Sequence, residues 1–374
     1  IDRSVRGIIK SVRKDGDRAL MRFAKKFDNV AMSSKDLRVT NAELRSASRN
    51  VGKDVAAALK FAHKNIESFH RKGLRKGWSG KNVQGAVVGE KYDAFSRVGI
   101  YIPGGTAPLV STALMTVTLA KVAGCQEICV CTPPGADGSV NSDLLYACRM
   151  AGASEIYKVG GAQAIAAMAY GTRSIRSVQK IYGPGNAYVV VAKRLLFGQV
   201  AIDLLPGPSE LLVIADDSAK PKSIAADLLA QAEHGSGHER CWLVTPSGKL
   251  LRAVEKEIEK QLPTLSRNRF IKVALKRNGW LIQVKDLSDA VNLANTLAPE
   301  HCEVMTRGAR KLANGILTAG AIFIGHWSPT VLGDYVAGPS HTLPTGGAGR
   351  SFAGLTVDQF QRRTSVVEYS RSAL

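Results

Sequence analysis

The sequence predicts an α/β protein in which two parallel-sheet domains flank a cleft and a helical segment comes first. The chain has 374 residues, enough for two domains at about 100–200 residues each. From about residue 95 onward, short apolar runs alternate with helical patterns, which is the order of a parallel sheet covered by helices. The first 75 residues instead repeat apolar side chains at spacings of three and four, which is typical of helices.

The N-terminal segment, residues 1–95, is expected to be helical and to pack on the second α/β domain. Thr40 and Glu43 have the spacing of a capping box, so a further helix should begin there. The stretch Gly77–Gly89 is rich in glycine and is expected to be irregular. The helical spacing is clear in three stretches: Val5–Val12, Leu20–Phe27 and Val55–Phe69.

Residues 96–210 are expected to form the first α/β domain. Its strands are short apolar runs that end in glycine or proline: Val98–Ile102, Ile128–Cys131, Ile156–Val159 and Lys180–Tyr182. Its helices are Ser111–Ala123, Leu144–Ala151, Ala164–Tyr170 and one that follows Asn186.

Residues 211–297 repeat this alternation and should form the second domain, so both domains are Rossmann-like. The expected strands are Leu211–Ala215, Cys241–Val244 and Leu281–Val284, and the helices are Ile224–Glu233, Leu251–Leu262 and Ala290–Leu297. Residues 298–345 should return to the cleft and the first domain, through Glu303–Met305, Ala309–Leu317 and Ile322–Ile324. Residues 346–374 are interpreted as the start of a truncated C-terminal tail.

Composition and charge narrow the function classes. The 51 basic and 31 acidic residues give a formal net charge of +20, but the basic residues are interleaved with apolar ones at helical spacing. That pattern favours solvated helix faces over a nucleic-acid-binding stripe. No run approaches the roughly 20 apolar residues of a membrane span. The six cysteines show no CxxC spacing and are expected to be buried thiols of a cytoplasmic protein.

Two groups of side chains point to metal chemistry. Gln231 and His234 share one face at the end of a helix, just before a Gly-Ser-Gly bend. Asp334 lies in a stretch rich in glycine and proline that should be a loop presenting its side chains. These three residues would supply nitrogen and oxygen ligands with one position left open. The alternative for His234 is a simple C-cap, and His238 competes as a ligand although it is expected to face solvent.

A possible acid/base pair follows a proline. Because Pro299 breaks the chain between a helix and a strand, Glu300 and His301 are expected on a turn. An ordinary surface turn is the alternative. Another proline-containing segment, the rigid turn Pro206–Glu210, could present Ser209 to the cleft.

Nucleotide binding would have to use unusual glycine turns. The chain has no GxGxxG after a strand and no GxxxxGK[ST], which argues against the usual dinucleotide fingerprint and against a P-loop. Three other glycine turns occur at strand-to-helix junctions, where backbone N–H groups can approach a phosphate. They are Tyr101–Gly105, Gly160–Gln163 and Gly183–Asn186. Tight packing of strand on helix would explain them equally well.

Taken together, these segments resemble the histidinol dehydrogenase family. The similarity rests on seven motifs in the family's order: Tyr101–Pro108, Val159–Ile165, Tyr182–Ala187, Pro206–Glu210, Gln231–His234, Pro299–His301 and Gly333–Thr345. They run from about residue 97 to the end of the chain, and the helical N-terminus carries no motif.

The resemblance implies oxidation of L-histidinol to L-histidine through histidinal, with NAD and one Zn²⁺ per subunit. It implies that Glu300 and His301 are the acid/base pair and that Tyr101, Gln163 and Asn186 contact NAD. The zinc ligands would be Gln231, His234 and Asp334, and these residues with Ser209, His301 and His341 would contact the substrate. His301 would take the hydroxyl proton, and Glu300 would activate water for the second oxidation.

The resemblance also implies a homodimer with shared active sites. Family members continue past Leu374 into a short C-terminal domain that supplies the partner subunit with a fourth zinc ligand, so this chain would lack that ligand. Two alternatives stay open. One is a related zinc and NAD enzyme acting on another small polar alcohol, such as a sulfopropanediol. The other is a basic, non-catalytic binding module. No nucleic acid or membrane partner is expected.

Overall fold

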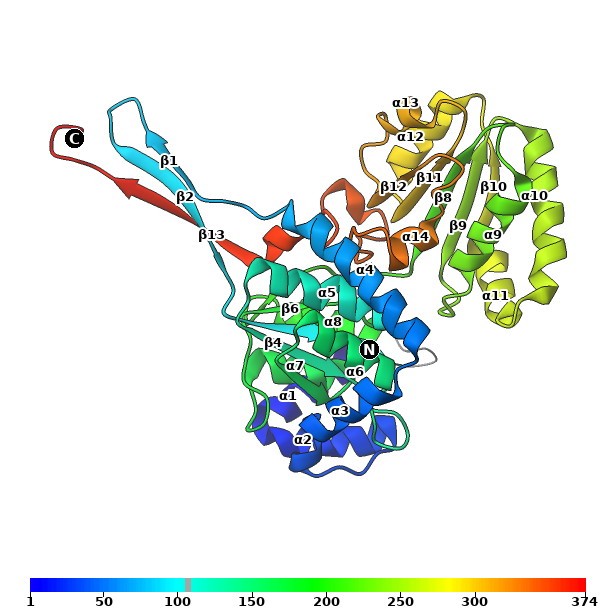
Figure 1. The fold of residues 1–374 in the computed structure, drawn as a ribbon. Coiled ribbons are helices and arrows are strands. Elements are labelled where there is room, and N and C mark those ends of the chain that lie inside the picture. Colours follow the sequence, from blue (N-terminus) through cyan, green and yellow to red (C-terminus); the bar gives the residue numbers. More distant parts are fainter. Residues whose placement is uncertain (105–108) are drawn as a thin grey trace. The chain divides into compact units, whose positions relative to one another are not determined.

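The computed structural model describes residues 1–104 and 109–374 and divides the chain into two compact units. Unit 1 consists of Ile1–Leu205, Val336–Thr342 and Leu355–Leu374, and unit 2 consists of Pro206–Tyr335 and Leu343–Gly354. Each unit contains one parallel five-stranded sheet (Figure 1). The prediction of two parallel-sheet units with a helical N-terminal segment is therefore confirmed. Among the described residues, no helix is long and apolar enough to cross a membrane.

The parallel sheet of unit 1 has the strand order β5-β4-β3-β6-β7. Its strands are β3 (Arg97–Tyr101), β4 (Glu127–Thr132), β5 (Glu155–Lys158), β6 (Lys180–Tyr182) and β7 (Ala201–Ile202). The helices are α1 (Asp2–Asp15), α2 (Asp17–Phe23), α3 (Asn41–Asn50), α4 (Lys53–Arg71), α5 (Val110–Ala123), α6 (Ser142–Ala151), α7 (Gly161–Tyr170) and α8 (Ala187–Leu196). The chain adds strands from β3 outward to β5 and then returns to place β6 on the other side of β3. The order in which the parallel strands are added therefore reverses between β3 and β6.

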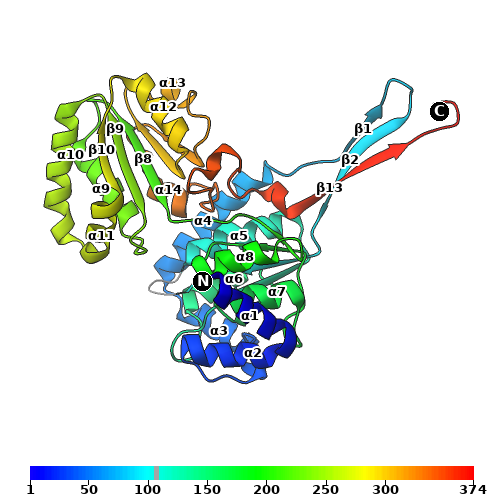
Figure 2. The ribbon, with the colours of Figure 1, turned by 180° about the vertical axis from the view of Figure 1, so that it is seen from behind.

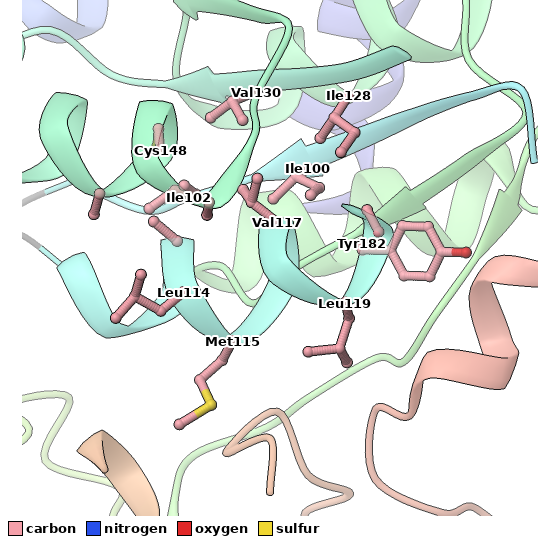
Figure 3. Packing of buried hydrophobic residues seen from close by; sticks show 14 of the residues in the cluster. Ile100, Ile102, Leu114, Met115, Val117, Leu119, Ile128, Val130, Cys148 and Tyr182 are labelled. Carbon is pink, nitrogen blue, oxygen red and sulfur yellow. The ribbon is translucent and has the colours of Figure 1, made fainter. Parts of the chain in front are cut away.

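Alternate residues of β3 and β4 face the two sides of this sheet. Ile100 and Val130 pack under α5 and α6, whereas Cys129 and Cys131 face the side covered by α1, α7 and α8. Figure 3 shows the first of these layers, with Leu114 and Val117 of α5 among its side chains. The view in Figure 2 shows α1 beside α7 on the other side, in agreement with their contacts.

The N-terminal helices pack on the first α/β unit, whereas the sequence analysis expected them to pack on the second. Helix α4 lies on α5, α3 on α6, and α1 on α7 and α8. The physical reason is visible in α5, where every residue from Thr112 to Ala120 is buried. A helix that is apolar all round needs a cover on the side away from its sheet. Ala62 and Ile66 of α4 supply that cover.

A second, antiparallel sheet in unit 1 joins the region before β3 to the end of the chain. Its order is β1-β2-β13, with β1 at Trp78–Lys81, β2 at Val87–Ala94 and β13 at Gln361–Glu368. The stretch Gly77–Gly89 is thus partly strand, and the prediction that it is irregular was wrong. Figure 1 shows the three strands as a long ribbon that carries the C-terminus. The segment 346–374, interpreted as the start of a tail, contributes β13 to this sheet.

The parallel sheet of unit 2 has the order β10-β9-β8-β11-β12, which is the same order of succession as in unit 1. Its strands are β8 (Glu210–Ala215), β9 (Arg240–Thr245), β10 (Gly279–Gln283), β11 (His301–Met305) and β12 (Ala321–Ile324). The helices are α9 (Pro221–Ala232), α10 (Gly248–Gln261), α11 (Asn268–Asn278), α12 (Leu287–Leu297), α13 (Ala309–Ala313) and α14 (Thr330–Tyr335). Apolar side chains of α9, α10 and α11 cover one face, and those of α12 and α13 cover the other.

Two local predictions in unit 2 were wrong, and both concern the candidate site. Asp334 lies in helix α14 instead of a loop. His301 is the first residue of β11 instead of part of a turn. The backbone carbonyls of Pro299 and Glu300 accept hydrogen bonds from Gly320 and Ala321, both at 2.9 Å, so the extended pairing with the β12 segment begins before His301. The reversal that Pro299 suggested is made one residue earlier, where Ala298 has φ 49°.

All six cysteines are free and buried. Burial raises the pKa of Cys125, Cys148 and Cys241 to about 12, and it raises that of Cys302 further. These thiols are therefore small apolar side chains at neutral pH, as the sequence analysis expected.

Gly183, between β6 and α8, is held by a buried ion pair. Lys193 and Asp203 pair with side-chain exposures of 1% and 0%. Asp203 accepts the Gly183 N–H at 2.7 Å, and the Lys193 ammonium donates to the Gly183 carbonyl at 2.9 Å. Gly183 has φ 107°, and a Cβ on it would lie 2.1 Å from the carbonyl oxygen of Tyr101. The turn is thus fixed by both charge and close packing.

We expect Gly183→Ala to reduce the free energy of unfolding by about 3 kcal/mol or more, because a strained φ is combined with a backbone clash. Gly198→Ala is the matched control, since Gly198 has φ 98° but nothing within 4 Å of its Cβ position. Gly198→Ala should reduce the free energy of unfolding by only about 1 kcal/mol, because only the positive φ is unfavourable for alanine there. Urea unfolding of both variants measures the difference, and equal losses would show that the close approach to Tyr101 does not matter.

Candidate active site

One group of candidate residues lies at the amino ends of two neighbouring strands in unit 2. His301 is the first residue of β11 and Glu210 the first of β8 beside it, and Glu300 and Ser209 immediately precede these two strands. Glu300 is buried, and one of its oxygens accepts the Ser209 hydroxyl at 2.5 Å and the Glu210 N–H at 2.9 Å. Burial raises the pKa of Glu300, while the nearby His301 opposes that shift. The carboxyl group is therefore fixed in place, and its burial favours the protonated form.

The neighbouring imidazole of His301 is oriented from both sides. It is buried, and its Nδ1 lies 3.0 Å from the Glu210 carbonyl. Because a carbonyl oxygen can only accept, Nδ1 carries the proton and Nε2 is left as the basic nitrogen. That Nε2 is 3.7 Å from a carboxylate oxygen of Asp334. His301 and Glu300 are also close, with 3.5 Å between Nδ1 and the carboxylate.

Asp334 owes its position to the packing of α14. Gly333 fits against the ring of Phe323, where a Cβ would come within 2.6 Å of the ring atoms, and Phe323 in turn lies 6.0 Å from the His301 ring centre. At its other end, α14 begins at Thr330, whose N–H and hydroxyl both donate to the buried Glu303 carboxylate, at 2.6 and 2.5 Å. Helix α14 also contacts α9.

The candidate metal ligands Gln231 and His234 lie at the end of α9. Gln231 is buried, and within the described chain its amide nitrogen has no hydrogen-bond partner. His234 is exposed, and its Nδ1 lies 2.8 Å from the Gln231 carbonyl, which leaves Nε2 available as a ligand atom. With Asp334, these side chains would offer oxygen and nitrogen donors of the type that zinc accepts. In the part of the chain that the structure describes, no three His, Cys, Asp or Glu side chains gather to hold a metal ion, so a site here would also need the amide oxygen of Gln231.

A separate pocket of about 940 Å³ lies in unit 1 and brings together the three candidate NAD contacts. Tyr101, Gln163 and Asn186 all line it. Tyr101 is the last residue of β3, and Gln163 and Asn186 follow β5 and β6, so the pocket lies at the carboxyl ends of these strands. It is beside the point between β3 and β6 where the order of the strands reverses. That edge is where α/β sheets commonly bind nucleotides.

Each of the three residues is fixed by its own contacts. The Tyr101 hydroxyl accepts the Gly161 N–H at 3.0 Å, and burial raises the pKa of this phenol to about 12. The side chain of Gln163 folds over Gly161. Asn186 caps helix α8 by accepting the N–H groups of Tyr188 and Val189. Residues 105–108 of the Tyr101–Pro108 motif lie outside the described residues.

Three further candidates are Ser209, His341 and His238. Ser209, expected to contact substrate, donates to Glu300. His341 belongs to the segment Val336–Thr342 of unit 1. That segment is anchored to α4 by Asn65, whose amide donates to the Val336 carbonyl at 2.9 Å. His238 is exposed, as expected.

Sequence reasoning missed two acidic residues beside the unit 2 site. Glu303 is buried and carries the start of α14, and Asp227 of α9 faces it. Burial, followed by the charge of Asp227, raises the pKa of Glu303 to about 8, and burial raises that of Asp227 to about 6. Glu303 is two residues beyond His301 on the strand and so shares its face. That alternation is the signal that could have identified it.

The fold has a pocket at the carboxyl ends of one parallel sheet and a buried glutamate beside a buried histidine at the amino ends of the other, which is typical of an α/β enzyme. Comparison with known proteins gives the particular family. The profile of the histidinol dehydrogenase family matches residues 1–374. The chain therefore belongs to the histidinol dehydrogenase family, and it is an enzyme.

Individual histidinol dehydrogenases are similar to this chain over nearly its whole length. The histidinol dehydrogenase of a Synechococcus strain is 46% identical over 99% of this chain and 85% of its own length. That of Geobacillus kaustophilus is 46% identical over 100% of this chain and 87% of its own length. A crystal structure of histidinol dehydrogenase from Elizabethkingia anophelis matches with a TM-score of 0.96 at 36% identity, covering 99% of this chain and 85% of that one.

The buried Glu303 gives unit 2 a distinctive pH dependence. Its pKa of about 8 in the folded state lies above the ordinary value of 4.5, so the folded state binds the proton more tightly. The stability that this proton provides is present below the ordinary pKa and is lost as the pH rises through about 8. We expect Glu303→Gln to remove up to about 3 kcal/mol of that decline between pH 5 and 8, since one pKa unit corresponds to about 1.4 kcal/mol.

Tryptophan fluorescence during urea unfolding at several pH values measures this, because three of the four tryptophans, Trp242, Trp280 and Trp327, are in unit 2. Glu255→Gln, at an exposed position on α10, changes the charge equally and should keep the parent's slope. An unchanged slope in Glu303→Gln would contradict the assigned role.

Proposed function

We propose that this chain catalyses the NAD-dependent oxidation of L-histidinol to L-histidine, through histidinal, in the last steps of histidine biosynthesis. Family membership supports histidinol oxidation in this pathway. The observation that carries the mechanism is the orientation of His301: the Glu210 carbonyl holds Nδ1, so that the basic Nε2 lies beside Asp334.

In the first oxidation, His301 Nε2 accepts the proton of the substrate hydroxyl while the carbon-bound hydride leaves. When bound in the pocket lined by Tyr101, Gln163 and Asn186, NAD is the hydride acceptor. Glu210 keeps the imidazole in the correct tautomer through its main-chain carbonyl, so this orientation does not depend on a mobile side chain.

In the second oxidation, Glu300 acts as the base for the water that adds to the aldehyde. Burial raises the pKa of Glu300, and a raised pKa makes a carboxylate a stronger base. The Ser209 hydroxyl and the Glu210 N–H hold one carboxylate oxygen, which fixes the direction in which the other oxygen can act.

Gln231, His234 and Asp334 would hold a zinc ion, one per subunit. Such an ion would supply a fixed positive charge that binds the amino and imidazole nitrogens of the substrate. The position of Gln231 at the end of α9 and the available Nε2 of His234 support this assignment. Ser209 and His341 complete the proposed substrate contacts. We further propose that the protein is a homodimer with shared active sites, which the family resemblance supports. We propose that it is cytoplasmic, which its six free thiols support.

We expect His301→Asn to lower kcat for histidinol oxidation by about 10²–10⁴-fold, the usual contribution of a positioned base. Glu300→Gln should impair histidinal oxidation more than histidinol oxidation, because it removes the base that acts on water. Measuring the two half-reactions separately, with histidinol and then histidinal as substrate, tests both roles. Equal losses in both steps for Glu300→Gln, with no loss for His301→Asn, would overturn the assignment. Turnover of a sulfopropanediol in preference to histidinol would overturn the substrate.

We expect Asp334→Asn to weaken zinc binding by about ten-fold or more, because an anionic ligand becomes neutral. Zinc retained against a competing chelator, measured by elemental analysis, reports this without any turnover. Asp289→Asn, at an exposed position on α12, is the charge-matched control and should retain zinc like the parent. Equal retention in the two variants would remove Asp334 from the ligand set.

A further inference from the structure

The pocket of unit 1 has an unusual distribution of charge. Among the described residues that line it, Asp28 is the one with a charged side chain, and the lining contains no Lys, Arg or His. The other polar groups are amides, hydroxyls and phenols, such as Asn141, Ser139 and Tyr188. A ligand that enters this pocket therefore meets one negative charge and no matching positive side chain.

Asp28 is held in a defined place but has no partner there. It is the last residue of η1, a π-helical turn at Ala24–Asp28, and Asn29 at φ 57° ends that turn. The preceding Phe27 stacks on the buried Phe23 with 5.5 Å between ring centres. Within the ranges that the structure describes, no hydrogen bond or ion pair engages the Asp28 carboxylate. Burial raises its pKa to about 6, so the group is still ionised at neutral pH.

The sheet itself provides no carboxylate at the position where dinucleotide-binding sheets normally have one. In such sheets an acidic residue near the end of the second strand accepts the hydroxyls of the adenosine ribose. The second strand here is β4, and it is followed by Pro133 and Pro134, which line the pocket. Asp137 in the same loop accepts the N–H and the hydroxyl of Ser139 and does not line the pocket. Asp28 reaches the pocket from outside the sheet instead.

We propose that Asp28 makes this pocket select a dinucleotide with a free ribose 2′-hydroxyl and reject one with a 2′-phosphate. The proposal rests on the proposed function of the pocket as the cofactor site. A ribose diol offers two O–H donors and no charge, so it satisfies an unpaired carboxylate. A 2′-phosphate would bring like charge to the same place, where no basic side chain among the described lining residues compensates it.

The test compares ADP-ribose with 2′-phospho-ADP-ribose by calorimetric titration, so that neither substrate nor metal is needed. The parent should prefer ADP-ribose, and Asp28→Asn should reduce that preference by about ten-fold or more, because the like-charge repulsion is lost. Asp28→Ala, which removes the acceptor altogether, should change the preference in the same direction. Asp54→Asn, at an exposed position in the first turn of α4, changes the net charge equally and should keep the parent's preference.

The possible failures are distinguishable. If the parent binds ADP-ribose and the preference is the same in the Asp28 and Asp54 variants, Asp28 is not the selecting residue, while the cofactor assignment of the pocket stands. If the parent binds neither probe, the proposed cofactor site fails and the selectivity proposal fails with it. If Asp54→Asn shifts the preference as much as Asp28→Asn, the effect is one of net charge, and the proposal is overturned.

Discussion

The hydrogen bonds between the buried Glu303 carboxyl group and Thr330 are the interaction on which the arrangement of Asp334 and His301 in unit 2 depends. Helix α14 has six residues, too few to be stable without tertiary contacts. Glu303 accepts the first N–H of that helix and the hydroxyl of Thr330, so it anchors α14 to the strand that begins with His301. Gly333 then allows the helix to approach Phe323. The distance between Asp334 and His301 follows from these contacts and not from a preference of the segment itself.

The two parallel sheets share one order of strands but use opposite edges. In unit 1 the pocket lies at the carboxyl ends of the strands, whereas in unit 2 Ser209, Glu300 and His301 lie at the amino ends. At the carboxyl ends of the strands in unit 2, a side chain of the protein itself binds backbone N–H groups. Asp216 accepts the N–H groups of Ser218 at 2.9 Å and of Arg307 at 3.1 Å. An internal carboxylate thus occupies the backbone donors that could otherwise face a phosphate.

The parallel sheets were predictable because their strands are short buried apolar runs, such as Leu211–Ala215, separated by helical patterns. The antiparallel sheet was not, because it pairs residues 87–94 with 361–368, and no local pattern reports so distant a partner. Helix α14 was hidden by Gly333, whose role lies in packing against Phe323.

The same distinction applies to the candidate sites. Local sequence suggested Gln231 with His234 and Glu300 with His301, because each pair is close along the chain. The bond from Ser209 to Glu300 spans 91 residues and could not be inferred from spacing. Tyr101, Gln163 and Asn186 were suggested as cofactor contacts by family resemblance, and the structure brings them to one pocket. Asp28 carries no motif, and only the lining of that pocket draws attention to it.

The burial of all six thiols has a practical consequence. Four of them, Cys125, Cys129, Cys131 and Cys148, are in unit 1, and two, Cys241 and Cys302, are in unit 2. A thiol reagent can modify such a group only during an opening that exposes it. Peptide mapping after a brief exposure to an alkylating reagent would therefore record which unit opens first and how often. The native chain contains its own set of reporters of partial unfolding, distributed over both sheets, without any engineered label.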